Sequence, residues 1–178
     1  MNENYIINNI TKSKKFFSTL SRSQMTEKIC RLAVSTHPAN ITYVPKDKQT
    51  KALWELAISI EPNTIGSLPK EQRTDDLAWT AIKRQWSTIM LIPNPSAAMV
   101  EYVAEYLHSG GVSGMQRWFR RIKQTPETRQ IVLKYSAFYI HDCWEPTIDD
   151  WILAGSQNKS LLRWAPKEYR AQLELMLM

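Results

Sequence analysis

A pattern of about 24 residues recurs three times without a gap in the first half of the chain, and it restricts the fold more than any other feature. The copies begin at Thr26, Thr50 and Thr74. Proline makes up about 5% of residues in average proteins. The chance that the second and third copies both have a proline in the same column as the first is therefore about 1 in 400. The chain is therefore expected to contain tandem repeats. The recurring columns are Ile29, Leu53 and Leu77; Ala33, Ala57 and Ala81; Val34, Ile58 and Ile82; Ile41, Ile65 and Ile89; and Pro45, Pro69 and Pro93.

Each copy predicts a helix followed by a second, shorter helix. The three threonines are predicted N-caps, because a hydroxyl at a helix start can accept a hydrogen bond from a free N–H of the first turn. The apolar columns that follow share one helical face, and the alanine within it leaves room for a neighbouring helix. Pro38 and Pro62 suit the first turn of the shorter helix, because proline lacks an N–H that would have no partner there. Trp86 takes that position in the third copy.

A single pair of such helices cannot bury its own apolar face, so successive pairs are expected to stack. The predicted fold is all-α: two-helix repeats stacked as an α-solenoid-like array with additional C-terminal helices. Residues 1–25 form an N-terminal basic segment, 26–96 the three repeats and 97–178 a C-terminal helical part, all within one folding unit. Thr147 is a candidate start for a degenerate fourth repeat, whereas the segment before it is predicted to be helical without repetition.

The pattern T-x-x-L-x-x-x-A-V, with a following short helix that ends in Y-V-P, resembles a family of tandem short helical repeats of unassigned function. The resemblance covers about Thr26 to Ser96. It implies a helical repeat fold and transfers no catalytic residue, cofactor or partner.

The net charge of +6 arises in two short segments. A basic excess of this size permits nucleic acid or an acidic protein surface as a partner and requires neither. No apolar run approaches the roughly 18 residues of a membrane span. The N-terminus also lacks a secretory signal pattern, so a cytoplasmic protein is expected. The basic residues of the two segments are Lys12, Lys14, Lys15 and Arg22 in the first, and Arg117, Arg120, Arg121 and Lys123 in the second.

The second basic segment is the strongest candidate for a binding site. Gly110, Gly111 and Gly114 precede it, and glycine-rich backbone before a helix can hold an anion while arginines beside an aromatic residue suit phosphates and bases. The alternative is a linker followed by an amphipathic helix, with Trp118 and Phe119 in the core and the arginines in solvent.

Two tryptophans of the third repeat are further candidates. Trp79 stands where the other copies have Arg31 or Glu55, and Trp86 stands where they have proline. Both are predicted either to face outward as protein-binding anchors or to pack against a neighbouring unit. Trp54, in contrast, lies on the apolar face and is predicted to be core.

Catalytic signatures are weak. His141, Asp142 and Cys143 bring an imidazole, a carboxylate and a thiol together, but adjacent helical residues point in different directions, so a helix C-terminal turn is expected there instead of a metal or nucleophile site. Cys30 and Cys143 are too few for a disulfide framework. No phosphate-binding or dinucleotide-binding motif is present. The sequence thus predicts no enzyme, cofactor or metal.

These observations favour a non-enzymatic interaction protein, such as an accessory or inhibitory factor, that binds a partner protein and no membrane. The alternative is a nucleic-acid-binding protein that uses residues 117–123 and the N-terminal lysines. Salt distinguishes them, because phosphate contacts lose affinity steeply with ionic strength. The sequence defines no oligomeric state. The predicted partner-binding residues are Arg117, Trp118, Arg120, Arg121, Lys123, Trp79 and Trp86.

Overall fold

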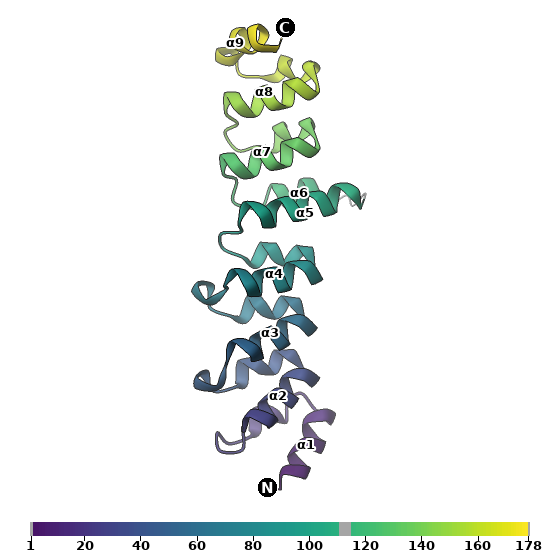
Figure 1. Cartoon of the computed structure of the whole chain (residues 1–178), viewed down its shortest axis with the longest axis vertical. Helices are drawn as coiled ribbons and strands as arrows, with labels where there is room; N and C mark the ends of the chain where they lie inside the picture. Colours follow the sequence, from purple (N-terminus) through teal and green to yellow (C-terminus); the bar gives the residue numbers. More distant parts are fainter. Residues whose placement is uncertain (1, 111–114, 178) are drawn as a thin grey trace. The chain divides into compact units, whose positions relative to one another are not determined.

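The computed structural model describes residues 2–110 and 115–177, and within these ranges it contains helices and no strand (Figure 1). The chain divides into two compact units, Met1–Pro93 (unit 1) and Asn94–Met178 (unit 2). The predicted all-α architecture of short, successively packed helices is confirmed.

Unit 1 contains the three repeats as the sequence predicts, and each consists of an α-helix and a shorter 3-10 helix. The α-helices are each 10 residues long and the 3-10 helices 6 residues long. Trp86 begins the 3-10 helix of the third repeat, in place of proline. The pairs are α2 (Glu27–Thr36) with η2 (Pro38–Tyr43), α3 (Lys51–Ile60) with η4 (Pro62–Ser67), and α4 (Asp75–Arg84) with η6 (Trp86–Leu91); the short turns η3 (Lys46–Lys48) and η5 (Lys70–Gln72) link them.

The apolar columns form the core of unit 1. Ala33, Ala57 and Ala81 are fully buried, which lets α3 pack closely against α2 and α4. Trp54 is also buried, as predicted. Each fully buried Leu, Ile or Val stabilises the fold by about 1.5–3 kcal/mol relative to exposure. The remaining buried columns are Ile29, Leu53 and Leu77; Val34, Ile58 and Ile82; and Ile41, Ile65 and Ile89.

The predicted threonine caps are confirmed in two repeats and corrected in the third. The hydroxyls of Thr26 and Thr50 each accept a hydrogen bond from the backbone N–H three residues later, at 3.3 Å. Thr74 has the same extended N-cap backbone, but its side chain makes no capping hydrogen bond. Asp75 and Asp76 in the first turn supply the negative charge that favours a helix N-terminus there.

The N-terminal basic segment is part of the packed unit. It forms α1 (Glu3–Lys12) and η1 (Phe17–Thr19), and α1 packs on α2 through the buried Ile6 and Ile10. An ion pair of 2.8 Å between Lys28 and Glu3 joins the two helices at the surface.

Unit 2 contains two more copies of the same two-helix unit. Those that begin at Thr125 and Thr147 also have an α-helix of 10 residues and a 3-10 helix of 6 residues. The segments that begin at Thr125 and at Thr147 thus have the same helix lengths as the repeats of unit 1, and the first of them lies where the sequence suggested helices without repetition. The helices of unit 2 are α5 (Ala97–Ser109), α6 (Met115–Phe119), α7 (Pro126–Tyr135), η7 (Ala137–Asp142), α8 (Ile148–Gln157), η8 (Lys159–Trp164) and α9 (Lys167–Leu177).

The last helix, α9, packs on α8 at Gly155, which occupies the column of Val34 and Ile58. A Cβ at Gly155 would lie 2.6 Å from Leu162 Cδ2 and 2.7 Å from Leu177 Cδ1. The missing side chain thus leaves the space that these two leucines fill.

A polar contact that the sequence analysis missed recurs at the end of four short helices. In three of them the side chain that directly precedes the N-cap of the next helix donates a hydrogen bond to the carbonyl oxygen five residues earlier, at the C-terminal end of the short helix. In the fourth, the donor Arg170 lies in the first turn of α9. This satisfies a carbonyl that has no partner within its own helix. The pairs are Gln49 to Val44 at 2.8 Å, Arg73 to Leu68 at 2.9 Å, Gln124 to Phe119 at 3.1 Å and Arg170 to Ala165 at 3.0 Å.

Candidate functional site

We number positions in each repeat from its N-cap residue, which is Thr26, Thr50 or Thr74. Residues at positions 3, 4, 7 and 8 point into the core, so residues at positions 2 and 5 form the outer face of unit 1. Most of their side chains are exposed, and Glu55 and Trp79 are half-buried. The outer face consists of Lys28 and Arg31 on α2, Ala52 and Glu55 on α3, and Asp76 and Trp79 on α4.

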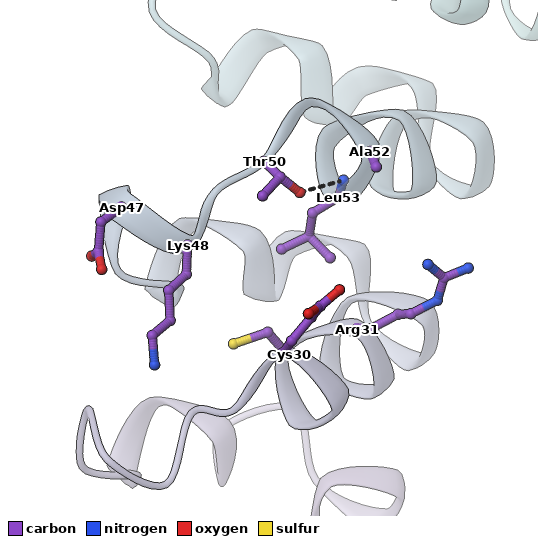
Figure 2. A pocket seen from close by; sticks show the side chains of 8 residues that line it. Cys30, Arg31, Asp47, Lys48, Thr50, Ala52 and Leu53 are labelled. Atoms are coloured by element: carbon purple, nitrogen blue, oxygen red, sulfur yellow. Dashed lines mark hydrogen bonds between the residues drawn. The ribbon is translucent and has the colours of Figure 1, made fainter.

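A cavity of about 280 Å³ opens between α2 and α3 on this face (Figure 2). Cys30 lines it from position 4, where the next repeat carries the much larger Trp54. The small side chain thus accounts for the unfilled space. Figure 2 shows Arg31 and Lys48 on opposite sides of the cavity. The full lining is Glu27, Cys30, Arg31, Asp47, Lys48, Thr50, Ala52 and Leu53.

The cavity does not activate its thiol. Burial raises the pKa of Cys30, and the nearby Lys48 ammonium offsets this only in part. Cys30 Sγ contacts the carbonyl oxygen of Met25 at 3.6 Å, and Lys48 Nζ donates to the same oxygen at 2.7 Å. A protonated thiol, an alanine and a leucine give the cavity an apolar floor with charged groups at its rim. Such a cavity suits a side chain of a partner better than it suits covalent chemistry.

A second, open hollow of about 430 Å³ lies on α4 and is lined by Asp76, Trp79, Thr80 and Lys83. The ammonium of Lys83 lies over the ring of Trp79, 5.5 Å from its centroid, which is cation–π geometry. Both cavities include residues at positions 2 and 5, so they lie on the same outer face.

An ion pair joins α3 and α4 beside this hollow. Lys51 Nζ lies 2.6 Å from Asp76 Oδ2 and 3.7 Å from Glu55 Oε1. The hydrogen bond from Lys51 lowers the pKa of Asp76, and the same bond raises the pKa of Lys51. Charges of both signs therefore alternate across the outer face.

The predicted partner-binding residues fall in both units. Trp79 lies on the outer face of unit 1 and Trp86 is half-buried at the start of η6. In unit 2, Trp118 is only 3% exposed, so its ring belongs to the core, together with Phe119 and Ile122. The amphipathic alternative thus describes this segment. The exposed residues of the segment are Arg117, Arg120, Arg121 and Lys123.

The glycine-rich stretch before this segment is only partly described. Gly110 is the C-cap of α5, whereas Gly111 and Gly114 lie outside the described residues.

The cluster at His141, Asp142 and Cys143 is structural. The buried carboxylate of Asp142 accepts a hydrogen bond from Arg120 Nε at 2.5 Å and from Gln116 Nε2 at 3.3 Å. Burial, with a further contribution from Asp150, raises the pKa of Cys143 to about 12, so this thiol holds its proton at neutral pH. In residues 2–110 and 115–177, no group of three or more His, Cys, Asp or Glu is arranged to hold a metal ion.

Sequence reasoning overlooked three exposed rings in unit 2. Phe138, Trp144 and Trp164 are 63%, 58% and 61% exposed. Trp164 occupies position 17 of its repeat, which holds the exposed Tyr43 in the first copy. Aligning the second half of each unit from Thr125 and Thr147 would have placed these rings in or just after the short helices, but it would not have shown that they are exposed.

Within the described parts of the chain, every helix is too short or too polar to cross a membrane. No protein-family model, no curated protein and no solved structure matches this chain.

Proposed function

We propose that this chain is a non-enzymatic interaction protein, a helical-repeat scaffold that binds a partner protein through the outer face of unit 1. It would act by occupying the partner's surface, as a cytoplasmic accessory or inhibitory factor. The repeat pattern supports placing it among proteins built from tandem short helical repeats. The observation that carries the proposal is the presence of two cavities on one face of neighbouring repeats, one of them beside Trp79.

The residues of this face match those that dominate protein interfaces. Tryptophan and arginine are enriched among the residues that contribute most binding energy, and they act by filling or lining pockets. Trp79 is held by Lys83 at one hollow, and Arg31 borders the other cavity. A partner could therefore insert one side chain into each hollow and contact the ridge between them.

The charge of the face also favours a protein over a phosphate backbone. Glu55 and Asp76 lie among Lys51, Lys28 and Arg31, so a polyanion would meet carboxylates as well as cations. A protein surface with both signs of charge can complement such a pattern.

The test is capture of partners by the tagged full-length chain from a cell extract, with and without nuclease and at low and high salt. We expect a captured protein to resist both treatments and to be lost with Trp79→Ala. Tyr43→Ala, which removes an exposed ring from η2, is the matched control and should retain it. Capture that disappears with nuclease, or that is the same for both variants, would contradict the proposal.

A further inference from the structure

The short helices of unit 2 form a second surface that the proposed function does not use. Helix α6 is joined to η7 by the ion pair between Arg120 and Asp142. Helix η7 is joined to η8 by His141 and Trp164, whose ring centroids are 6.4 Å apart and nearly perpendicular. We call this surface the basic aromatic edge. It consists of Arg117, Arg121, Phe138, His141, Arg163 and Trp164.

The rings on this edge are not needed for the repeat fold. Phe138 occupies position 13, where the repeats of unit 1 have Ala39, Asn63 and Ser87. With 63% of Phe138 and 61% of Trp164 in solvent, neither ring gains the burial that normally stabilises an aromatic side chain. Large rings held in water at these positions point to a ligand that covers them.

The arginines of the basic aromatic edge have no acidic partner among the described residues. The exposed guanidinium groups of Arg117 and Arg121 make no ion pair or side-chain hydrogen bond with any other residue that the structure describes. That of Arg163 lies over the ring of Trp164, 5.2 Å from its centroid. Asp142 is the one acidic residue in α6, η7 and η8, and its carboxylate is buried and already bound by Arg120.

Unit 2 as a whole carries nearly equal numbers of basic and acidic residues, so this edge results from segregation of charge. On α5, Glu101 lies 3.6 Å from Lys134, and Glu101 and Glu105 both raise the pKa of Tyr135, second to its burial. The carboxylates of α5 thus lie beside α7, whereas the arginines gather on the short helices.

From this arrangement we infer that the basic aromatic edge binds single-stranded nucleic acid, with bases stacked on Phe138 and Trp164 and phosphates held by Arg117, Arg121 and Arg163. Exposed rings interleaved with cations are what such binding requires, and stacking is tolerant of sequence because every base has a π-face. An acidic protein segment fits less well, because protein anchors are normally buried in pockets, whereas most of the Phe138 and Trp164 rings lies in solvent. The inference is independent of the proposed function, which concerns unit 1.

Binding is measured by fluorescence anisotropy with a labelled oligothymidylate of about 20 nucleotides and the full-length chain. Phe138→Ala combined with Trp164→Ala should weaken binding at least about tenfold, because two stacking surfaces are lost. Tyr43→Ala combined with Tyr106→Ala removes two exposed rings elsewhere and should change little. Phe138→Tyr combined with Trp164→Phe keeps both rings and should restore binding.

The charge contribution is tested separately. Arg117→Glu with Arg121→Glu should weaken binding and lower the slope of log affinity against log salt by about 1.4, at about 0.7 for each phosphate contact with a single strand. Lys46→Glu with Lys70→Glu makes the same change of net charge on exposed lysines of unit 1 and should leave the slope unchanged.

Three results would overturn the inference. Equal losses in the two charge-reversal variants would indicate an effect of net charge without a site. Undiminished binding in the Phe138 and Trp164 alanine variant would eliminate stacking. Binding of polyglutamate in place of the oligonucleotide would assign the edge to an acidic protein. Far-UV circular dichroism of each variant verifies that the helices remain folded.

Discussion

Arg129 Nε donates a hydrogen bond to Asp150 Oδ2 at 2.7 Å, and the two residues occupy the repeat positions that hold Trp54 and Leu77 in unit 1. Their side chains are only 7% and 0% exposed. The same oxygen accepts from the backbone N–H of Thr147 at 2.9 Å. One carboxylate thus joins α7 to the first turn of α8, where the other unit has apolar side chains.

Removing one partner of this buried pair should be far more harmful than removing both. Arg129→Met leaves Asp150 buried without its cation and should lower the free energy of unfolding by about 3–5 kcal/mol. Adding Asp150→Leu should recover most of this loss, apart from about 1 kcal/mol for the lost cap. Urea unfolding followed by circular dichroism measures both variants. A double variant that is no more stable than Arg129→Met would show that the pair is not the cause.

The N-cap threonines of unit 1 should differ in their contribution to stability. Thr50→Ala removes the hydroxyl that accepts from Leu53 N–H and should cost about 1 kcal/mol. Thr74→Ala should cost clearly less, because that hydroxyl makes no capping hydrogen bond. Thermal unfolding of the two variants under identical conditions makes the comparison. Equal shifts of the midpoint would contradict the structural difference between the two caps.

The side chain before each helix start should be replaceable by its counterpart from another repeat. Arg73 donates to the carbonyl oxygens of Leu68 at 2.9 Å and Gly66 at 3.0 Å, and also to that of Leu91. Arg73→Leu leaves these carbonyls unsatisfied and should cost about 1–3 kcal/mol. Arg73→Gln should cost less, because Gln49 makes the same kind of hydrogen bond at the matching place in the first repeat. Chemical denaturation ranks the two variants, and an inverted order would refute this role.

Cys143 should react slowly with thiol reagents in the folded chain. Its pKa is raised from 9.0 to about 12, so the reactive thiolate is scarce below that pH, whereas it forms readily in the unfolded chain. The folded state holds the proton more tightly, so this group's stabilising contribution is intact below pH 9 and is lost as the pH rises towards 12. Labelling of a Cys30→Ser variant with a disulfide reagent, with and without denaturant, measures the difference. Rapid labelling of the native protein at pH 8 would contradict the buried environment.

The sequence predicted unit 1 well because its columns are filled by similar apolar residues, so each copy confirmed the others. The copy at Thr125 was hidden because Val132 replaces the alanine, Arg129 an apolar residue and Trp144 the proline. The same helix lengths survive these changes, and the Thr125 hydroxyl still caps the first helix.

The candidate sites were predictable only in part. Trp79 was identifiable because it breaks a column, but the cavity beside Cys30 was not, since empty space depends on which side chains meet across two helices. The exposure of Phe138 and Trp164 was similarly hidden, because the faces of a 3-10 helix follow a period of three residues and the copies differ there.

Helix α9 has a consequence for assembly. Leu173 of this helix is fully buried in the cluster that contains Trp151 and Ala154, on the side of α8 where a further repeat would otherwise stack. Repeat arrays with an open end tend to recruit other molecules of themselves and grow into filaments. Because α9 covers this side of α8, we expect a chain shortened before Lys167 to expose the apolar surface of Trp151 and Ala154 and to associate with other copies of itself.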